Sequence, residues 1–301
     1  MIAGLQMIEK QIHQKIVDEL NKIGLLYRIF IRIKNESSIN EKIERKSKEG
    51  EPYAENGKKI QDIIGVRIVT YFKDDVNVVK EILNNKFKFI DEEIDELELT
   101  VFKPKRTNII CQFDENQIQI LEEVSSASKN FNFNLIDKTF ELQLRTMLSE
   151  GWHEIDHSLR YKCTEDWTKH KESERLLNGI YASLETNDIA LKNLFHELSY
   201  KHFKSKNWQA LLRNKFRLQF QLSDLNVELL NKLNEDNSIG KKIVKIDRTE
   251  FLLKLSNLDL SLPVNFNNLL YLLNLIEIKN DEISRITPEI IKTIHRNSQE
   301  I

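Results

Sequence analysis

The feature that most constrains the fold is a nearly continuous apolar run from Ile63 to Phe72. It is rich in β-branched and aromatic residues, which favour strands. A strand with so few polar positions belongs in the centre of a sheet, where neighbouring elements cover it. Asp62 precedes the run and Arg67 lies within it. We therefore expect a central strand that begins next to a carboxylate and carries a guanidinium group.

Two further segments alternate apolar and polar residues, as strands do. In residues 25–34 this period places Arg32 and Lys34 side by side on one face. In residues 138–145 the apolar positions would face the core, which leaves Glu141, Gln143 and Arg145 on the opposite face, about 7 Å apart in succession. A carboxylate, an amide and a guanidinium group in one row indicate a cleft, although a solvated strand face would give the same pattern.

Strands and helices interleave as far as Cys163, and the chain is almost wholly helical beyond Glu172. Periodicity and capping residues predict helices at 5–23, 38–49, 74–85, 117–123 and 148–161, with further strands at 96–103 and 107–113. The predicted fold class is α+β, with a mixed β-sheet flanked by helices in residues 1–165 and an all-α domain in residues 166–301.

The composition excludes several classes of protein. The chain has 301 residues, 40% apolar and 31% charged, and its net charge of -2 means that any site for a polyanion must be a local patch. The two cysteines, Cys111 and Cys163, lack metal-site spacing and fit a reducing cytoplasm. No segment reaches the roughly 18 consecutive apolar residues of a membrane span. We expect a cytoplasmic protein that does not insert into a membrane.

Acidic and basic groups at the predicted strands indicate a chemistry. Mg²⁺ prefers one or two carboxylates together with phosphate oxygens of a substrate, and Asp62, at the start of a buried strand, is a suitable acid. Arginine binds phosphate through paired hydrogen bonds or stacks on a base. The combination is typical of a phosphoryl or pyrophosphoryl transferase.

These motifs, in this order and spacing, resemble the RelA/SpoT-type alarmone synthetases over residues 25–165. The matching residues are Arg32-Ile33-Lys34, Ser37-Ser38-Ile39 and Lys42; Asp62, Gly65 and Arg67; Glu141-Leu142-Gln143-Leu144-Arg145-Thr146; and Trp152, Glu154, His157, Tyr161 and Lys162. The resemblance implies a nucleotidyltransferase-like sheet. It also implies a Mg²⁺-dependent pyrophosphokinase that moves the β,γ-pyrophosphate of ATP to the 3′-hydroxyl of GDP or GTP, giving (p)ppGpp-like alarmones.

The resemblance also implies a role for each matching residue. Asp62 and Glu141 would be the catalytic acids and the metal ligands. The residues that would bind ATP and its phosphates are Arg32, Lys34, Ser38, Lys42, Arg67 and Arg145. Gln143 and His157 would shape the acceptor side.

One loop departs from the family pattern. The family usually has a Gly-Tyr-x-Ser-x-His loop whose tyrosine stacks on the acceptor base. In the corresponding residues 102–110, Arg106 stands in place of the tyrosine and Ile110 in place of the histidine. An arginine plane also stacks on bases, so Arg106 is predicted to bind the acceptor. The acceptor itself stays open between GDP or GTP, another nucleotide and the 3′ end of tRNA, which toxic relatives modify.

Two other classes of function remain open. His153-Glu154-Ile155-Asp156-His157 satisfies the HExxH pattern of zinc proteases, with a third ligand to be sought at His170, Glu172 or Glu174. Residues 200–217 interleave aromatic and basic residues in the manner of a nucleic-acid-binding surface. The basic residues predicted to contact tRNA are Lys201, Lys204, Lys206, Arg213, Lys215 and Arg217.

The nucleic-acid-binding alternative includes a catalytically silent module that binds a nucleic acid or another partner. The same pattern also fits a basic helix face whose aromatic residues Phe203, Trp208, Phe216 and Phe220 belong to the core. A homo-oligomer is compatible with the sequence, which does not set the oligomeric state.

Overall fold

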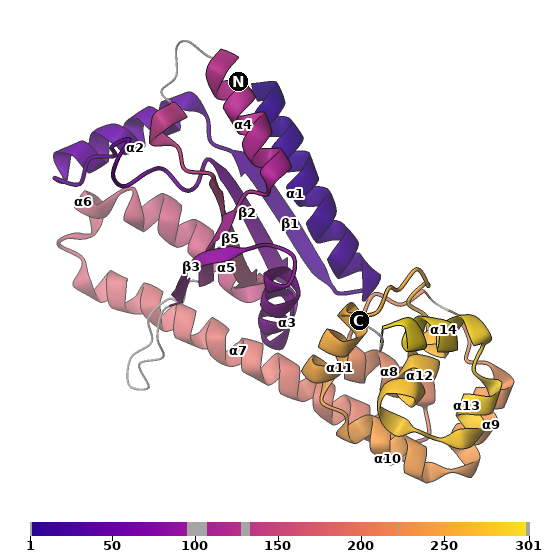
Figure 1. Ribbon diagram of the computed structural model, residues 1–301. Coiled ribbons are helices and arrows are strands. Elements are labelled where there is room, and N and C mark those ends of the chain that lie inside the picture. Colours follow the sequence, from indigo (N-terminus) through magenta and orange to yellow (C-terminus); the bar gives the residue numbers. More distant parts are fainter. Residues whose placement is uncertain (1, 95–106, 128–132, 222, 299–301) are drawn as a thin grey trace. The chain divides into compact units, whose positions relative to one another are not determined.

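The computed structural model describes residues 2–94, 107–127, 133–221 and 223–298 (Figure 1). The chain divides into two compact units, each assembled from three segments. The first, here the sheet unit, comprises Met1–Val17, Tyr27–Thr70 and Leu83–Glu185. The second, the helical unit, comprises Asp18–Leu26, Tyr71–Ile82 and Thr186–Ile301. The expected division into independent domains 1–165 and 166–301 stays a prediction.

Five strands form one mixed sheet in the described part of the sheet unit, in the order β1-β2-β5-β4-β3. Their bounds are β1 Tyr27–Ile33, β2 Ile64–Thr70, β3 Phe89–Ile94, β4 Thr107–Gln112 and β5 Thr139–Thr146. β2 and β5 pair in parallel, and the other neighbours are antiparallel. The predicted α+β class is confirmed, and the apolar run after Asp62 forms an inner strand, as expected.

The apolar face of this sheet is covered by the first helix. Phe140 of β5 contacts Phe87 edge-on at 5.3 Å between ring centroids, and Lys15 of α1 (Ile2–Lys22) lies over the Phe87 ring. Ile8, Ile12 and Ile16 are completely buried, which confirms the predicted amphipathic helix. α4 (Glu115–Ala127) lies beside α1 in Figure 1. With this face closed, the polar face of β5 is the one available for a site.

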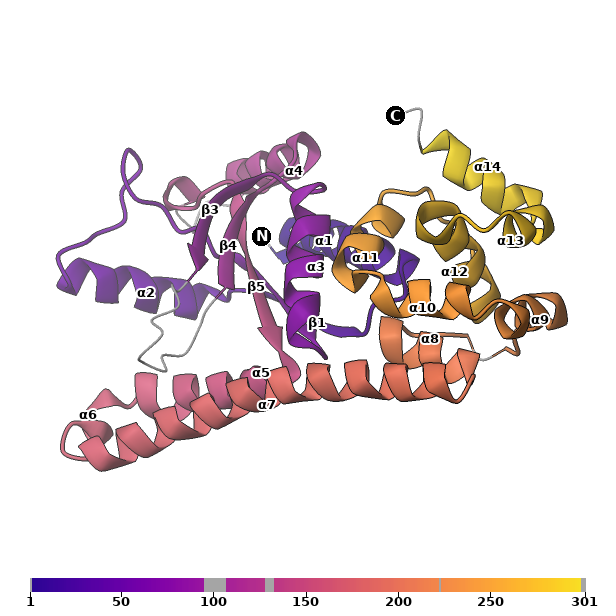
Figure 2. The ribbon, with the colours of Figure 1, turned by 90° about the horizontal axis from the view of Figure 1, so that it is seen from below.

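The helices on the polar side follow directly from the strands. α2 (Glu36–Lys48) succeeds β1, and α5 (Met147–Ile155) succeeds β5 and continues into a π-helical turn, Asp156–Tyr161. α6 (Thr164–Trp167) then leads to α7 (Lys171–Lys204), whose first part lies along α5 (Figure 2). The Trp152 indole donates to the carbonyl of Leu177 at 2.9 Å, which joins α5 to α7.

The structure differs from the sequence-based expectations at one helix start and at one strand, and a further predicted strand falls outside the described residues. The helix expected at Ser38 begins at Glu36, because the side chain of Asn35 caps it by accepting from the Ser38 amide. A strand was not expected at Phe89–Ile94, whose acidic residues disfavour strands; pairing with β4 supplies the stabilisation. The strand expected at 96–103 lies outside the described residues.

The helical unit contains the later part of α7 and most of α3 (Lys73–Asn84). Its other helices are α8 Trp208–Phe216, α9 Val227–Glu235, α10 Asn237–Lys245, α11 Arg248–Ser256, α12 Phe266–Leu273, α13 Asp281–Ile286 and α14 Glu289–Asn297. Phe216 and Phe251 meet at 5.3 Å in its core. Among the described helices of either unit, none combines the length and apolar character that a bilayer span requires.

Candidate active site

One pocket of about 700 Å³ opens on the polar side of the sheet unit. It is bounded by β1, α2, β2, β5, α5 and the π-helical turn. Its lining contains every predicted site residue that the structure describes, namely Arg32, Lys34, Ser38, Lys42, Asp62, Arg67, Glu141, Gln143, Arg145 and His157. Arg106, predicted to bind the acceptor, lies outside the described residues. Side chains from segments more than a hundred residues apart thus converge on one cavity.

Strand register explains why these residues converge. Gly65 of β2 lies between Arg32 of β1 and Glu141 of β5, and the next row places Arg67 beside Gln143. Since Gly65 has no side chain, the space between Arg32 and Glu141 stays open; a Cβ there would lie 3.8 Å from the Arg32 side chain. On this face of the sheet Glu141 therefore lies near Arg32 and Arg67, and the missing side chain at Gly65 leaves space between them.

Asp62 precedes β2 and is held by two lysines. Lys34 and Lys42 both donate to its Oδ2, the latter at 2.8 Å. Burial alone would raise the pKa of Asp62, but the two ammonium groups outweigh it and lower that pKa. The other oxygen, Oδ1, is buried and accepts no hydrogen bond from any described residue. Asp62 is consequently ionised and keeps one oxygen for a further electropositive partner.

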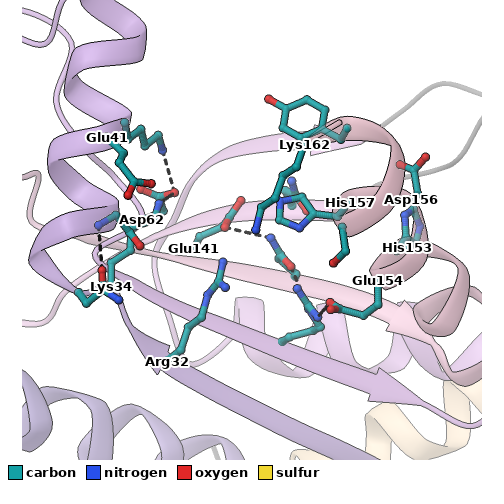
Figure 3. A pocket seen from close by; sticks show the side chains of 18 of the residues that line it. Arg32, Lys34, Glu41, Asp62, Glu141, His153, Glu154, Asp156, His157 and Lys162 are labelled. Atoms are coloured by element: carbon teal, nitrogen blue, oxygen red, sulfur yellow. Dashed lines mark hydrogen bonds and ion pairs between the residues drawn. The ribbon is translucent and has the colours of Figure 1, made fainter. Parts of the chain in front are cut away.

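Glu141 is the second acid of the pocket, and Figure 3 shows it beside Asp62 and Arg32. Burial, followed by the negative charge of Asp62, raises the pKa of Glu141. Gln143 donates to its Oε2 at 3.0 Å. Since the charge of Asp62 contributes to the raised pKa of Glu141, the two carboxylates lie close enough to interact, and both could contact one metal ion.

Arg67 and Arg145 form a guanidinium pair with two glutamate partners: Glu150 was missed from the sequence, and Glu154 was named as a matching residue without this role. Glu150 accepts from Arg67 Nη1 at 2.6 Å and from Arg145 Nη1 at 3.0 Å, while Glu154 accepts from the same Arg67 nitrogen. Arg67 Nε donates to Gln143 at 3.1 Å. Glu150 and Glu154 lie one turn apart on α5. This spacing puts both carboxylates on one helix face, and it was the signal in the sequence that could have identified them as partners of the arginines.

The π-helical turn contributes an aromatic pair to the pocket. The rings of His157 and Tyr161 stack at 5.8 Å with an angle of 13° between their planes. Arg160 fixes the turn, since it donates to the Asn178 side chain of α7 at 3.0 Å and forms an ion pair with Asp156 at 2.5 Å. π-helical turns are frequent at functional sites because they redirect side chains. Here the turn directs His157, Tyr161 and Lys162 to the pocket lining.

The donor set fits magnesium and does not fit zinc. Two carboxylates, one with a buried oxygen that accepts no hydrogen bond from the described residues, meet the preference of Mg²⁺ for a few acids plus substrate oxygens. His153 is instead buried against Trp152 and Tyr181, with ring centroids 5.3 and 5.8 Å away. No three potential ligands among His, Cys, Asp and Glu group together within the described residues. The zinc-protease alternative is therefore wrong.

The basic and aromatic segment of the helical unit is largely structural. Phe203, Trp208 and Phe216 are buried, as the core alternative predicted. Lys215 is 8% exposed and donates to the carbonyl of Val244, and Arg217 is 7% exposed and paired with Asp74. These two cations cannot contact tRNA as predicted. Lys201, Lys204, Lys206 and Arg213 are exposed, and a role for them stays a prediction.

Part of the sheet unit is similar to a region of known proteins. A family model described as the region found in RelA / SpoT proteins matches residues 31–166. The chain is 22% identical to small alarmone synthetase 1 from Bacillus subtilis, with 64% of this chain and 92% of that chain covered and a TM-score of 0.46. For a GTP pyrophosphokinase family protein from Streptococcus pneumoniae the identity is 22%, the coverage 64% and 88%, and the TM-score 0.45.

A third solved structure is the same Bacillus subtilis synthetase bound to its product pppGpp, at 21% identity, 65% and 94% coverage and a TM-score of 0.46. No curated protein matches this chain. The matched segment 31–166 contains all the residues that line the pocket. Residues 31–166 therefore match the region found in RelA / SpoT proteins.

Proposed function

We propose that this protein is a Mg²⁺-dependent pyrophosphokinase that transfers the β,γ-pyrophosphate of ATP to the 3′-hydroxyl of GDP or GTP. The observation that carries the proposal is the pair Asp62 and Glu141 in one pocket, surrounded by lysines and arginines. Pyrophosphoryl transfer depends on alignment of the reacting oxygens and on neutralised phosphate charge more than on covalent chemistry. The lysines and arginines of this pocket would supply the neutralising charge, and the two acids would align the metal ion and the attacking hydroxyl.

On the donor side, Arg32 and Arg67 would hold the adenine and phosphates of ATP. Lys34, Ser38 and Lys42 line the same wall of the pocket, and Arg145 adds a second guanidinium group beside Arg67. Several fixed cations in a partly buried site bind a triphosphate well, since its charge is spread over many oxygens. The two lysines already hold Asp62, so they would orient this acid towards the phosphates.

Magnesium would be held by Asp62 Oδ1 and Glu141, and when bound it would neutralise the phosphate oxygens and lower the barrier to attack. Glu141 is also suited to receive the proton of the attacking 3′-hydroxyl, because its raised pKa brings it closer to neutral pH. In this step the 3′-oxygen forms a bond to the β-phosphorus. The bond from that phosphorus to the oxygen it shares with the α-phosphate breaks, and AMP leaves.

On the acceptor side, Gln143 and His157 would border the nucleotide, with Arg106 as a predicted contact. The Tyr161 ring stacked on His157 adds a flat surface of the kind on which bases stack. Of the six predicted tRNA contacts, the four exposed ones, Lys201, Lys204, Lys206 and Arg213, keep tRNA as an acceptor to be tested, although Lys215 and Arg217 no longer support it.

Incubation with γ-labelled ATP and Mg²⁺ tests the proposal, with GDP, GTP, other nucleotides and bulk tRNA as separate acceptors. We expect the label to move to GDP or GTP and AMP to accumulate in equal amount. Label on tRNA alone would replace the nucleotide acceptor with the tRNA alternative. Bound ATP with no label transfer to any acceptor would overturn the enzyme assignment and leave a silent binding module.

A further inference from the structure

Two glutamates on one helix share a single nitrogen of the proposed donor site. Glu150 and Glu154, one turn apart on α5, both accept from Nη1 of Arg67. Figure 3 shows the Glu154 side chain extending from its helix into the pocket. A carboxylate and a phosphate offer similar oxygen pairs to arginine, so each glutamate occupies a position that a phosphate of the substrate could take.

The two glutamates differ in burial and in the number of their partners. The Glu150 side chain is 15% exposed and bridges Arg67 to Arg145 at 2.6 and 3.0 Å. That of Glu154 is 52% exposed, and its hydrogen-bonded partner among the described residues is Arg67. Glu150 also lies in the first turn of α5, where Thr146 and Ser149 form a capping box and the helix dipole favours a negative charge.

We propose that the two carboxylates have opposite effects on donor binding. Glu150 is a positioning residue that holds the two guanidinium groups together at a spacing suited to phosphate. Glu154 occupies Arg67 in the free protein and is displaced by the triphosphate. The inference rests on the proposed function, because it takes the anion that binds Arg67 to be the donor nucleotide.

The contacts around Arg67 make this exchange possible. Arg67 Nε is bonded to Gln143, and Gln143 is bonded in turn to Glu141, so the guanidinium plane is fixed independently of Glu154. Loss of the Glu154 contact therefore leaves Arg67 in place. The half-exposed Glu154 carboxylate can rotate into water at little cost, whereas Glu150 would lose its bonds to two partly buried arginines.

Equilibrium binding of a non-hydrolysable ATP analogue with Mg²⁺, measured by titration calorimetry, tests the inference on the whole chain. The variants are Glu154→Gln and Glu150→Gln, which remove one charge each from neighbouring turns. Glu197→Gln is the matched control. It also removes one glutamate charge from an exposed ion pair on a helix, here with Lys201 one turn away, and Glu197 does not line the pocket. We expect Glu154→Gln to bind about two- to fivefold more tightly, the factor of an exposed ion pair.

We expect Glu150→Gln to bind about tenfold more weakly, because charged hydrogen bonds to both arginines are lost. The control should bind as the wild type does. A merely structural role would weaken binding in both variants, so the opposite signs are the diagnostic result. Thermal unfolding identifies a Glu150→Gln protein that fails to fold, and Glu150→Asp, which keeps the charge, should then recover part of the affinity.

The outcomes separate this inference from the proposed function. Equal or weaker binding by Glu154→Gln overturns the inference, whether or not the wild type transfers pyrophosphate. Tighter binding by Glu154→Gln supports it, even in a protein that transfers no label to any acceptor. Absence of analogue binding in both the wild type and Glu154→Gln also overturns it.

Discussion

Asp62 of the sheet unit and Asp75 of the helical unit have the same local bonding pattern and different surroundings. Each gives one oxygen to basic side chains, Lys34 and Lys42 for the first and Arg248 for the second. In each, the other oxygen is buried and accepts no hydrogen bond from the described residues. A carboxylate with one buried oxygen that accepts no hydrogen bond from the described residues is therefore present in both units, and this feature alone does not define a site.

The difference lies in what surrounds each carboxylate. Asp62 lines a pocket, and the neighbouring lysines lower its pKa although burial opposes them. Asp75 is completely buried, and this burial raises its pKa in spite of Arg248. Arg248 is itself fixed by a 2.7 Å bond from its Nε to the carbonyl of Phe216. A carboxylate can take part in chemistry when cations and an accessible cavity keep it ionised, and it is structural when protein encloses it.

Removal of either pocket acid should have the largest effect. We expect Asp62→Asn and Glu141→Gln each to lower pyrophosphate transfer by a factor of about 10²–10⁴, because each loses a negative charge that metal binding or proton transfer requires. Initial rates with labelled ATP, together with circular dichroism to confirm folding, measure the effect. The matched variant Asp75→Asn should retain the turnover number of the folded protein. If Asp75→Asn is as inactive as Asp62→Asn, the functional distinction between the two aspartates is wrong.

Removal of the cation at the enclosed aspartate should have the largest effect on stability. Arg248→Met leaves the fully buried Asp75 without its ion-pair partner, which costs about 3–5 kcal/mol. Hydrogen exchange of α3 and α11 peptides should report this loss. The double variant Arg248→Met with Asp75→Leu should be more stable than Arg248→Met alone, because an apolar pair leaves no unpaired charge. A single variant as stable as the wild type would mean that Asp75 is neutral and needs no partner.

The two units also differ in how tightly one glycine of each is packed. A Cβ on Gly240 of α10 would lie 2.5 Å from the Trp208 ring and 2.8 Å from Phe203, so Gly240→Ala should destabilise the helical unit by about 1–3 kcal/mol. A Cβ on Gly151 of α5 would have no neighbour within 4 Å. Gly151→Ala should therefore stabilise its helix by about 0.5–1 kcal/mol. Urea unfolding of both variants measures the two effects, and equal signs would contradict this difference in packing.

The sequence predicts which residues line the pocket better than it predicts the ion pairs between them. Strand period and apolar character are local, so the polar face of 138–145 and the inner strand after Asp62 were readable without coordinates. Ion pairs between distant segments were not. Glu150 resembles a solvated helix residue until β2 brings Arg67, 83 positions earlier, within 2.6 Å.

The helical unit shows the same limit in the opposite direction. Its basic and aromatic residues resembled a nucleic-acid-binding surface, because periodicity does not reveal which cations are enclosed. Arg217 is buried over the Phe72 ring at 4.3 Å and bonded to Asp74, 143 positions earlier. The Lys215 ammonium group donates a hydrogen bond to the backbone carbonyl of Val244. Such roles depend on packing between segments far apart in the chain, and no local pattern encodes them.

The pH dependence of stability gives the smallest and most discriminating comparison of the two aspartates. The pKa of Asp62 is lowered from its ordinary 3.8, so its contribution is present above that value and is lost as pH falls through the lowered pKa. The pKa of Asp75 is raised from 3.8, so its contribution is present below that value and is lost as pH rises through the raised pKa. The stability advantage of the wild type over Asp62→Asn should therefore grow as the solution is brought from acid towards neutral pH. Its advantage over Asp75→Asn should shrink over the same change. Urea unfolding in the presence of EDTA, with hydrogen exchange of α3 to isolate Asp75, measures both; slopes of the same sign would show that protein encloses the two carboxylates alike.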